Sequence, residues 1–366
     1  MRSKMATVSY PDDSIVLKVP KINSLDTSST RPFWSVMIPV YNPPLPFLEE
    51  TLRCVLDQDA GADQMQIEVI DDASPNGAPT EFIRKLAGER VTVHCEPRNL
   101  GLARIWNRCI ERARGEWVHI LHQDDLVFPG FYQSLRTGAE KYPEAGAALC
   151  RHAYCDESGH WHRLSILEMP SPGLLQNFVE PIVTAERVQC AAIAVRRSTY
   201  EQLGGFNPDL KHALDWEMWI RTASKFPFFY EPKILACWRN HAGATASRQI
   251  RSGENIRDIA KAIGIWRKHL PEGEGQRLAE IAANRFSYEG FWMARHLLGQ
   301  NDFEGSLNQV SAALVCKNTF RLQLSAAKIR MKARGKLLLR RIRKPREIFF
   351  KESTLPSTVS SKSGLK

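Results

Sequence analysis

The stretch "GEWVHILHQDD", Gly115–Asp125, decides which fold this chain is expected to adopt. Its mostly apolar run stops at two adjacent carboxylates, Asp124 and Asp125. An exposed acidic turn would explain that ending. A metal site at the carboxyl end of a buried strand would explain it equally well. The segments on either side of the stretch are therefore needed to choose between the two.

Three earlier segments show the same rhythm of apolar strand and amphipathic helix. Strands are predicted at 34–42, 65–74 and 91–95, and helices at 45–58, 80–88 and 101–115. This alternation predicts parallel strands joined by crossover helices. Polar pairs follow the apolar runs at Tyr41-Asn42, Asp71-Asp72 and Asp124-Asp125. Ligands bind at the carboxyl ends of strands in such sheets, so these pairs mark a candidate site.

The second half of the chain begins with more sheet and ends in helices. A strand, a turn at Glu157–Gly159 and a returning strand are expected, followed by a strand that leads into a short helix. A strong helix at 212–226 and a last strand at 228–241 come next. From Ser252 the pattern is helical, and two antiparallel helices are predicted to meet at Gln300–Asp302.

The composition is that of a globular protein, with 43% hydrophobic and 25% charged residues among 366. The net charge of +10 is unevenly placed. Residues 321–351 hold twelve Lys/Arg and one acid, which is +11, so the remainder carries 10 − 11 = −1. The basic character belongs to this segment, and a nucleic-acid partner for the whole chain is not expected.

The compartment expected from the sequence is the cytoplasm. The chain shows no apolar run of about 18 residues and no secretory signal at its start. Its eight cysteines have no CxxC or zinc-type spacing, which favours reduced thiols.

Motifs in a fixed order carry a resemblance to a known family. They read "SVMIPVYN", "EVIDDAS", "RNLGLARIWNRCIERARGEWVHILHQDD", "GGFNPDLKHALDWEMWIR" and "CWRNH", over about Trp34 to Ala246. In that order they resemble the family 2 glycosyltransferases. The resemblance implies an α/β, Rossmann-like GT-A fold and transfer of a sugar from a nucleotide diphosphate to an acceptor hydroxyl, with inversion. It also implies Mn²⁺ or Mg²⁺ as cofactor.

The resemblance assigns roles to the strand-end residues. Asp125 would be the direct metal ligand, and Asp124 would lie near the donor ribose. A hard cation held by carboxylates would bridge the protein and the donor phosphates. Asp72 would accept a hydrogen bond from uracil or thymine, because an ionised carboxylate only accepts. Pro39 and Tyr41 would line the nucleotide pocket, although core packing of Tyr41 and a turn role of Asp72 remain alternatives.

Two further segments would contact the donor in the resemblance. Asn99 and Gly101 mark a loop before a helix, and Arg104 faces the donor from that helix. A helix start with nearby arginines suits phosphate. Arg239 and His241 follow the last strand. His241 would be a further metal ligand, or would contact the diphosphate together with Arg239. A surface role for the arginines and for His241 remains the alternative.

Asp215 occupies the position of the family's catalytic base. An inverting transfer needs a carboxylate that takes the proton from the acceptor hydroxyl. The family usually has Glu-Asp at this point, whereas this chain has Leu214-Asp215, so the base is kept and only its acidic neighbour is lost. Glu217 is a rival, but two residues further along a helix it turns away. The loop Gly204-Gly205-Phe206 fits the family's acceptor side.

The basic segment 321–351 alternates cations with apolar residues. At helical spacing this forms a basic amphipathic surface that an anionic membrane would attract. A solvated basic helix that covers the body is the alternative. A glycan or lipid-linked acceptor would agree with a peripheral position at the inner face of the membrane.

The predicted organisation has five parts. They are a flexible arm at 1–30, a GT-A domain at 31–250, a helical extension at 251–320, the basic segment at 321–351 and a disordered tail at 352–366. The expected function is transfer from a UDP- or dTDP-sugar in cell-surface polysaccharide or glycolipid synthesis. The alternatives are a metal-dependent nucleotidyltransferase and a non-catalytic glycan- or membrane-binding protein on the same fold.

Overall fold

The computed structural model describes residues 19–26, 30–241 and 245–343, and only the backbone for 245–247 and 339–343. The predicted tail at 352–366 and most of the predicted arm at 1–30 lie outside these residues. The part of the arm that is described, residues 19–26, packs on the domain. Ile22 is buried, and the Gly205 amide donates to the Pro20 carbonyl at 2.9 Å. Burial of one apolar side chain and a backbone hydrogen bond thus hold this segment.

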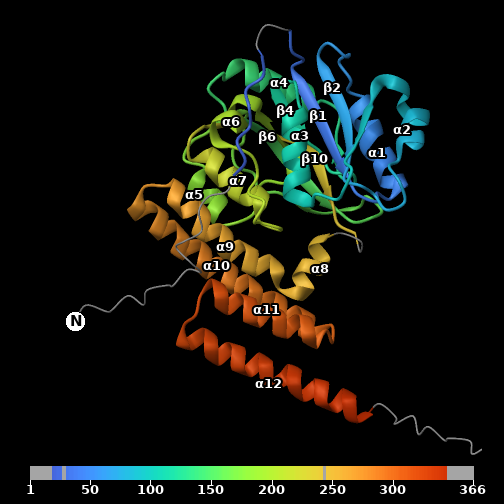
Figure 1. Cartoon of the computed structure of the whole chain (residues 1–366). Coiled ribbons are helices and arrows are strands. Elements are labelled where there is room, and N and C mark those ends of the chain that lie inside the picture. The colour runs from blue at the N-terminus through green and yellow to red at the C-terminus, as the bar shows by residue number, and fades with distance from the viewer. Residues whose placement is uncertain (1–18, 27–29, 242–244, 344–366) are drawn as a thin grey trace, which may run out of the picture.

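A single mixed sheet forms the centre of the molecule (Figure 1). Its strands are β1 (Trp34–Val40), β2 (Met65–Asp71), β3 (Thr92–Cys95), β4 (Trp117–Ile120), β5 (Leu126–Val127), β6 (Ala147–Cys155), β7 (Trp161–Leu164), β8 (Gly173–Leu175), β9 (Ile193–Arg196) and β10 (Phe228–Arg239). The order is β3-β2-β1-β4-β9-β6-β10-β5, with β7 beside β6 and β8 beside β10.

The parallel pairing predicted for the first four strands is confirmed, whereas the later strands pair in both directions, with β6 and β10 parallel. β1 pairs in parallel with both β2 and β4, and β2 with β3. β9 lies between β4 and β6 and runs antiparallel to both. Hydrophobic periodicity gives the side-chain alternation of a strand and not its direction, so the sequence did not reveal this insertion.

The helices cover the two faces of the sheet. They are α1 (Leu45–Leu56), α2 (Thr80–Ala87), α3 (Leu102–Arg112), α4 (Phe131–Lys141), α5 (Val179–Val183), α6 (Arg197–Leu203), α7 (Leu214–Ala223), α8 (Thr245–Ser252), α9 (Glu254–Trp266), α10 (Glu272–Gly299), α11 (Phe303–Cys316) and α12 (Phe320–Arg343). Val36 and Ile38 of β1 join the core under α1 and α4, whereas Met37 joins the core under α3 and α7.

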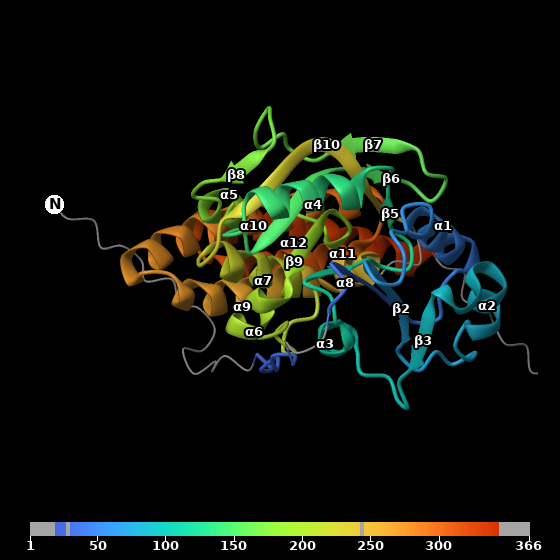
Figure 2. The same ribbon diagram turned by 90° about the horizontal axis from the view of Figure 1, so that it is seen from above.

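The helices after β10 continue the second of these cores. Ile259 of α9 and Phe286 of α10 belong to the same buried cluster as Met218 of α7. The cluster therefore crosses the predicted boundary at 250–251. Figure 1 shows α9 to α12 stacked below the sheet, with α12 outermost. In Figure 2, which looks from above, α10 to α12 lie behind the sheet, and α1 and α2 lie at the right, beside β2 and β3. None of the helices in the described residues is both long and apolar enough to cross a membrane.

Candidate functional site at the carboxyl ends of the strands

The turn after β4 separates its two carboxylates by burial. Asp125 is 1% exposed, and its Oδ1 accepts from the Arg239 amide at 3.0 Å. Its backbone carbonyl accepts from Thr51 Oγ1 at 2.8 Å. Its Oδ2 has no hydrogen-bond partner and lies 3.4 Å from Nδ1 of His122. Burial raises the pKa of Asp125, and the adjacent His122 opposes that shift.

Asp124 is the more accessible member of the pair. Its side chain is 20% exposed, and Oδ2 lies 2.9 Å from Nε2 of His241. The hydrogen bond to Asp124 raises the pKa of His241. The turn therefore presents Asp124 and His241 together, while Asp125 faces inward.

Arg239 holds this turn in place through contacts within the protein. It is 3% exposed, and Nε donates to the Asp124 carbonyl at 3.0 Å. Nη1 donates to the Glu157 carbonyl at 3.1 Å, and Nη2 pairs with Glu50. The guanidinium also lies over the Phe47 ring, 4.6 Å from its centroid. These contacts occupy three of the five guanidinium N–H groups, so Arg239 acts first as a structural link.

Asp72 is bound to the loop that precedes α3. It is 4% exposed, and its two oxygens accept from the Leu100 and Gly101 amides at 2.6 and 3.0 Å. Asn99 Nδ2 donates to the Asp72 carbonyl at 3.1 Å. Burial raises the pKa of Asp72, and the two amides oppose the shift. The structure thus joins Asp72, Asn99 and Gly101, and Gly101 has a φ of 79°, which favours glycine.

The remaining donor-side residues surround the same strand ends. Tyr41 is 50% exposed, and its amide donates to Gln123 Oε1 at 2.9 Å, which links the end of β1 to the acidic turn. Pro39 is buried within β1, opposite Ile70 of β2. Arg104 is exposed on α3. Tyr41 is therefore open to a ligand, whereas Pro39 shapes the strand.

Asp215 lies in the first turn of α7, near the acidic turn. Burial, and then the nearby Glu186, raise its pKa to about 6. Its Oδ1 accepts from the Trp216 amide at 2.7 Å. The charge of His122 acts on it in the opposite direction, which places the two side chains in one electrostatic environment. A carboxyl group with a pKa near neutrality is suited to proton transfer.

Glu217 is excluded as a rival base by its burial. It is fully buried and forms a two-point ion pair with Arg221, at 2.8 and 2.9 Å. Arg221 in turn donates to the Leu203 and Gly205 carbonyls. The pair therefore fixes α7 to the loop after α6 and presents nothing to a ligand.

The start of α7 is held by a residue that the sequence did not indicate. One carboxylate oxygen of Asp258, on α9, accepts from the amides of Lys211, His212 and Ala213 at 2.8, 2.7 and 2.9 Å. Asp258 thus holds the loop that leads into α7, and through the amide of the N-cap residue Ala213 it satisfies one of the donors that a helix start leaves unpaired. Asp258 lies far along the chain from Asp215 and belongs to no motif, so no sequence signal marked it.

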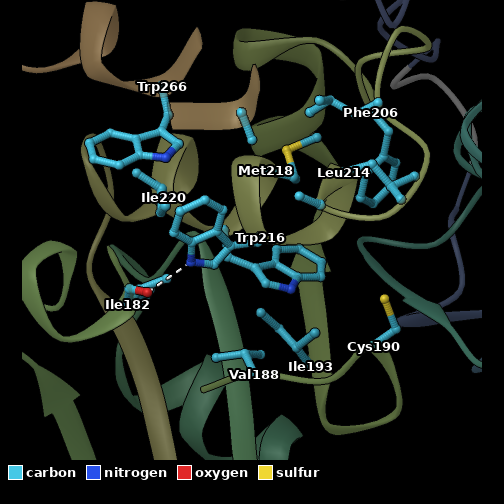
Figure 3. Close-up of a cluster of buried hydrophobic side chains, with 14 of the residues drawn as sticks. Ile182, Val188, Cys190, Ile193, Phe206, Leu214, Trp216, Met218, Ile220 and Trp266 are labelled. Atoms are coloured by element: carbon cyan, nitrogen blue, oxygen red, sulfur yellow. Dashed lines mark hydrogen bonds between the residues drawn. The ribbon is translucent and has the colours of Figure 1, made fainter. Parts of the chain in front are cut away.

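The inner face of α7 packs against residues of the sheet domain and against the helices that follow β10 (Figure 3). Trp216 is 2% exposed, and its Nε1 donates to the Ile182 carbonyl at 2.8 Å. Its ring contacts Trp266 and Phe286 edge-on, with centroids 5.8 and 5.0 Å away. The helix that carries Asp215 is therefore fixed to both the sheet domain and the helices that follow it.

The glycine loop predicted for the acceptor side is packed into the protein. Phe206 is fully buried, so its side chain does not line an acceptor site in this structure. Asn107 Oδ1 accepts from the Phe206 amide at 2.7 Å. A Cβ on Gly205 would lie 2.3 Å from that oxygen, and Gly204 has a φ of +82°. Close packing accounts for both glycines, and their contact with an acceptor stays a prediction.

The side chains that could ligate a metal here fit a divalent cation only in part. Among the residues that the structure describes, no group of three or more His, Cys, Asp or Glu side chains is arranged to hold a metal. Asp124 and His241 offer one carboxylate and one imidazole, and Asp125 adds a buried oxygen, Oδ2, that has no hydrogen bond and lies 3.4 Å from His122. Carboxylates suit both cations, whereas the imidazole suits Mn²⁺ better than Mg²⁺.

Comparison with known proteins agrees with this architecture. The crystal structure of S. aureus TarS 1-349 in complex with UDP-GlcNAc superposes with a TM-score of 0.58 at 18% identity, over 84% of this chain and 91% of that one. The fold is therefore the GT-A fold of glycosyltransferases. Residues 35–204 match the model of glycosyl transferase family 2, and this part of the chain belongs to that family.

Two curated relatives extend the comparison. Uncharacterized protein MT1568 of Mycobacterium tuberculosis is 27% identical over 259 residues, which are 65% of this chain and 77% of that protein. Minor teichoic acid biosynthesis protein GgaB of Bacillus subtilis is 28% identical over 105 residues, 28% of this chain and 11% of GgaB. The resemblance drawn from the motifs is thus confirmed, and the roles of single residues remain predictions.

Proposed function

We propose that this glycosyltransferase moves a sugar from a UDP- or dTDP-sugar to an acceptor hydroxyl with inversion, and that Asp215 is the base. The observation that carries the proposal is the position of Asp215, partly buried with a pKa of about 6, beside the acidic turn at the strand ends. A base next to a donor site is what a direct displacement requires.

The proposed reaction needs one proton acceptor and no covalent enzyme intermediate. Asp215 takes the proton of the acceptor hydroxyl while that oxygen forms a bond to the anomeric carbon. The bond from this carbon to the diphosphate oxygen breaks, and the nucleoside diphosphate leaves with the electron pair. Because Oδ1 of Asp215 already accepts from the Trp216 amide, we assign the proton transfer to Oδ2.

A divalent cation would neutralise the charge that develops on the departing diphosphate. We propose that Asp124 and His241 hold it, because Asp125 is buried and engaged by the Arg239 amide. This assignment moves the metal-ligand role expected for Asp125 to Asp124. Asp125 then keeps the turn in shape, and Arg239 supports it rather than binding the donor directly.

Recognition of uracil or thymine by Asp72 is compatible with its contacts. Each of its oxygens accepts one backbone hydrogen bond, and a carboxylate oxygen has a second lone pair. Asp72 also fixes the loop with Asn99 and Gly101, which places Arg104 at the start of α3. The UDP-GlcNAc in the TarS structure supports a uridine donor by analogy of fold.

A glycan or lipid-linked acceptor at a cell surface remains part of the proposal. The name of GgaB, a teichoic acid biosynthesis protein, supports such an acceptor, although the shared region is short. A cytoplasmic, peripheral position at a membrane is likewise proposed.

The test is a screen of UDP-, dTDP- and GDP-sugars with Mn²⁺, in which donor binding and release of nucleoside diphosphate are measured. Asp215→Asn should bind donor like the parent and lose transfer about a thousandfold. Asp209→Asn is the matched control, because Asp209 is exposed in the loop before α7. Binding of no nucleotide sugar would refute the proposed function. Full activity of Asp215→Asn would refute the assigned base. In a separate assay with UTP or dTTP and a sugar 1-phosphate, release of pyrophosphate would indicate a nucleotidyltransferase.

A further inference from the structure

Helix α12 has two apolar faces, and only one of them is covered. Leu322, Ala326 and Ile329 are buried in a cluster with Phe291 of α10 and Val310 of α11. This inner face secures the helix to the protein. A solvated helix with no further role would be expected to be polar on its other side.

The outer face of α12 is a second apolar stripe. Phe320, Leu324, Met331 and Leu338 are exposed by 77%, 50%, 71% and 60%. At about 3.6 residues per turn they fall within about 40° of one another, roughly opposite the buried face. Single exposed apolar residues are ordinary, but an aligned row along one helix marks an interaction surface. Figure 1 shows that α12 is the outermost of the stacked helices, so this stripe faces outward.

Cations border the stripe on both sides. Arg321, Lys328 and Lys332 are exposed along one border and Arg334 along the other. The sequence of 320–343 holds nine Lys/Arg and no acid. The net charge of the chain is +10, so the residues outside 320–343 carry only 10 − 9 = +1, and the positive charge is concentrated on this helix.

We propose that the outer face of α12 docks on an anionic lipid surface, with the helix axis parallel to the membrane. The apolar stripe enters the boundary between headgroups and acyl chains, and the bordering cations pair with lipid phosphates. This inference concerns a surface outside the strand-end site and does not rest on the proposed function.

The same features argue against two other occupants. A second copy of the chain docked through this face would bring two cationic helices together, and like charges at an interface are unfavourable. Nucleic acid would use the cations but would leave the aligned apolar stripe without a role. Anionic lipid is the partner that uses both.

The test is sedimentation of the full chain with vesicles of phosphatidylcholine alone or mixed with phosphatidylglycerol. Binding should require phosphatidylglycerol and weaken with salt. Phe320→Ser with Met331→Ser should reduce binding at least about tenfold, because both side chains leave the apolar stripe. Lys328→Gln with Lys332→Gln should reduce it by a similar factor.

The matched control is Ile166→Ser with Leu167→Ser, which removes exposed apolar side chains elsewhere on the surface. Its binding should equal that of the parent, and circular dichroism should show that all variants fold alike. Equal vesicle binding by the Phe320 and Met331 double variant would overturn the proposal in favour of charge alone. Self-association without vesicles that this variant abolishes would overturn it in favour of a dimer.

Discussion

The acidic turn after β4 and the start of α7 both present a carboxylate to one site, but different parts of the chain support them. The turn at 122–125 is held by Thr51 and Arg239, which belong to the sheet domain. The loop at 211–213 is held by Asp258 of α9, which follows the last strand. The donor side is thus self-contained, whereas the base side depends on the helices that come after the domain.

Among the substitutions that test this difference between the two sides, Trp216→Ala is expected to have the largest effect. Trp216 is 2% exposed and packs against Trp266 and Phe286, so its loss should lower the free energy of unfolding by about 3–5 kcal/mol. Urea unfolding measures this change. Under native conditions the affinity for the donor should stay close to that of the parent. A loss of donor affinity equal to the loss of turnover would show that the two sides are not separate.

Asp258→Ala should have the next largest effect. It removes the acceptor of three amides before α7, and unsatisfied buried donors cost roughly 1–3 kcal/mol. Turnover should fall while donor affinity is kept. Asp258→Asn retains an oxygen acceptor and should recover part of the turnover, which separates positioning of Asp215 from general destabilisation. Unchanged turnover in a destabilised Asp258→Ala would break the proposed link between α9 and the base.

On the donor side, His241→Gln should raise the Mn²⁺ concentration needed for half-maximal activity by about tenfold, within the range for a weakened metal site. The imidazole lies 2.9 Å from Oδ2 of Asp124, the other proposed ligand. Turnover at saturating Mn²⁺ should change little. Equal Mn²⁺ dependence in parent and variant would remove His241 from the metal site.

The smallest effect is the pH dependence of the base. The pKa of Asp215 is raised from 3.8 to about 6 by burial, so the group is protonated and inactive below that pH. Log kcat/KM should rise with pH up to about 6 and then level off. The same shift means that folding favours protonated Asp215, so its contribution to stability decreases as the pH rises from about 4 to 6. A flat profile between pH 5 and pH 7, about one unit either side of that pKa, would exclude Asp215 as the titrating base.

The sequence indicated the positions of the strand-end carboxylates more completely than the contacts that support Asp215. Strand ends are visible as apolar runs that stop at polar pairs, so Asp72, Asp124 and Asp125 were found from their positions. Their accessibility was not visible, because the contact of Asp125 with Arg239 joins segments far apart in the chain. The antiparallel direction of β9 and the hydrogen bonds from residues 211–213 to Asp258 were missed for the same reason, since neither leaves a local pattern in the sequence.

The hydrogen bonds from residues 211–213 to Asp258 also limit which segments of this protein can be exchanged with those of a relative. The family model ends at residue 204, before the base and before α9. Exchange of the C-terminal helices with those of a relative would leave three amides without their acceptor unless an equivalent carboxylate came with them. The chain is therefore expected to tolerate substitution of its donor-side residues more readily than replacement of the helices that support Asp215. Chimeras should keep residues 205–266 together.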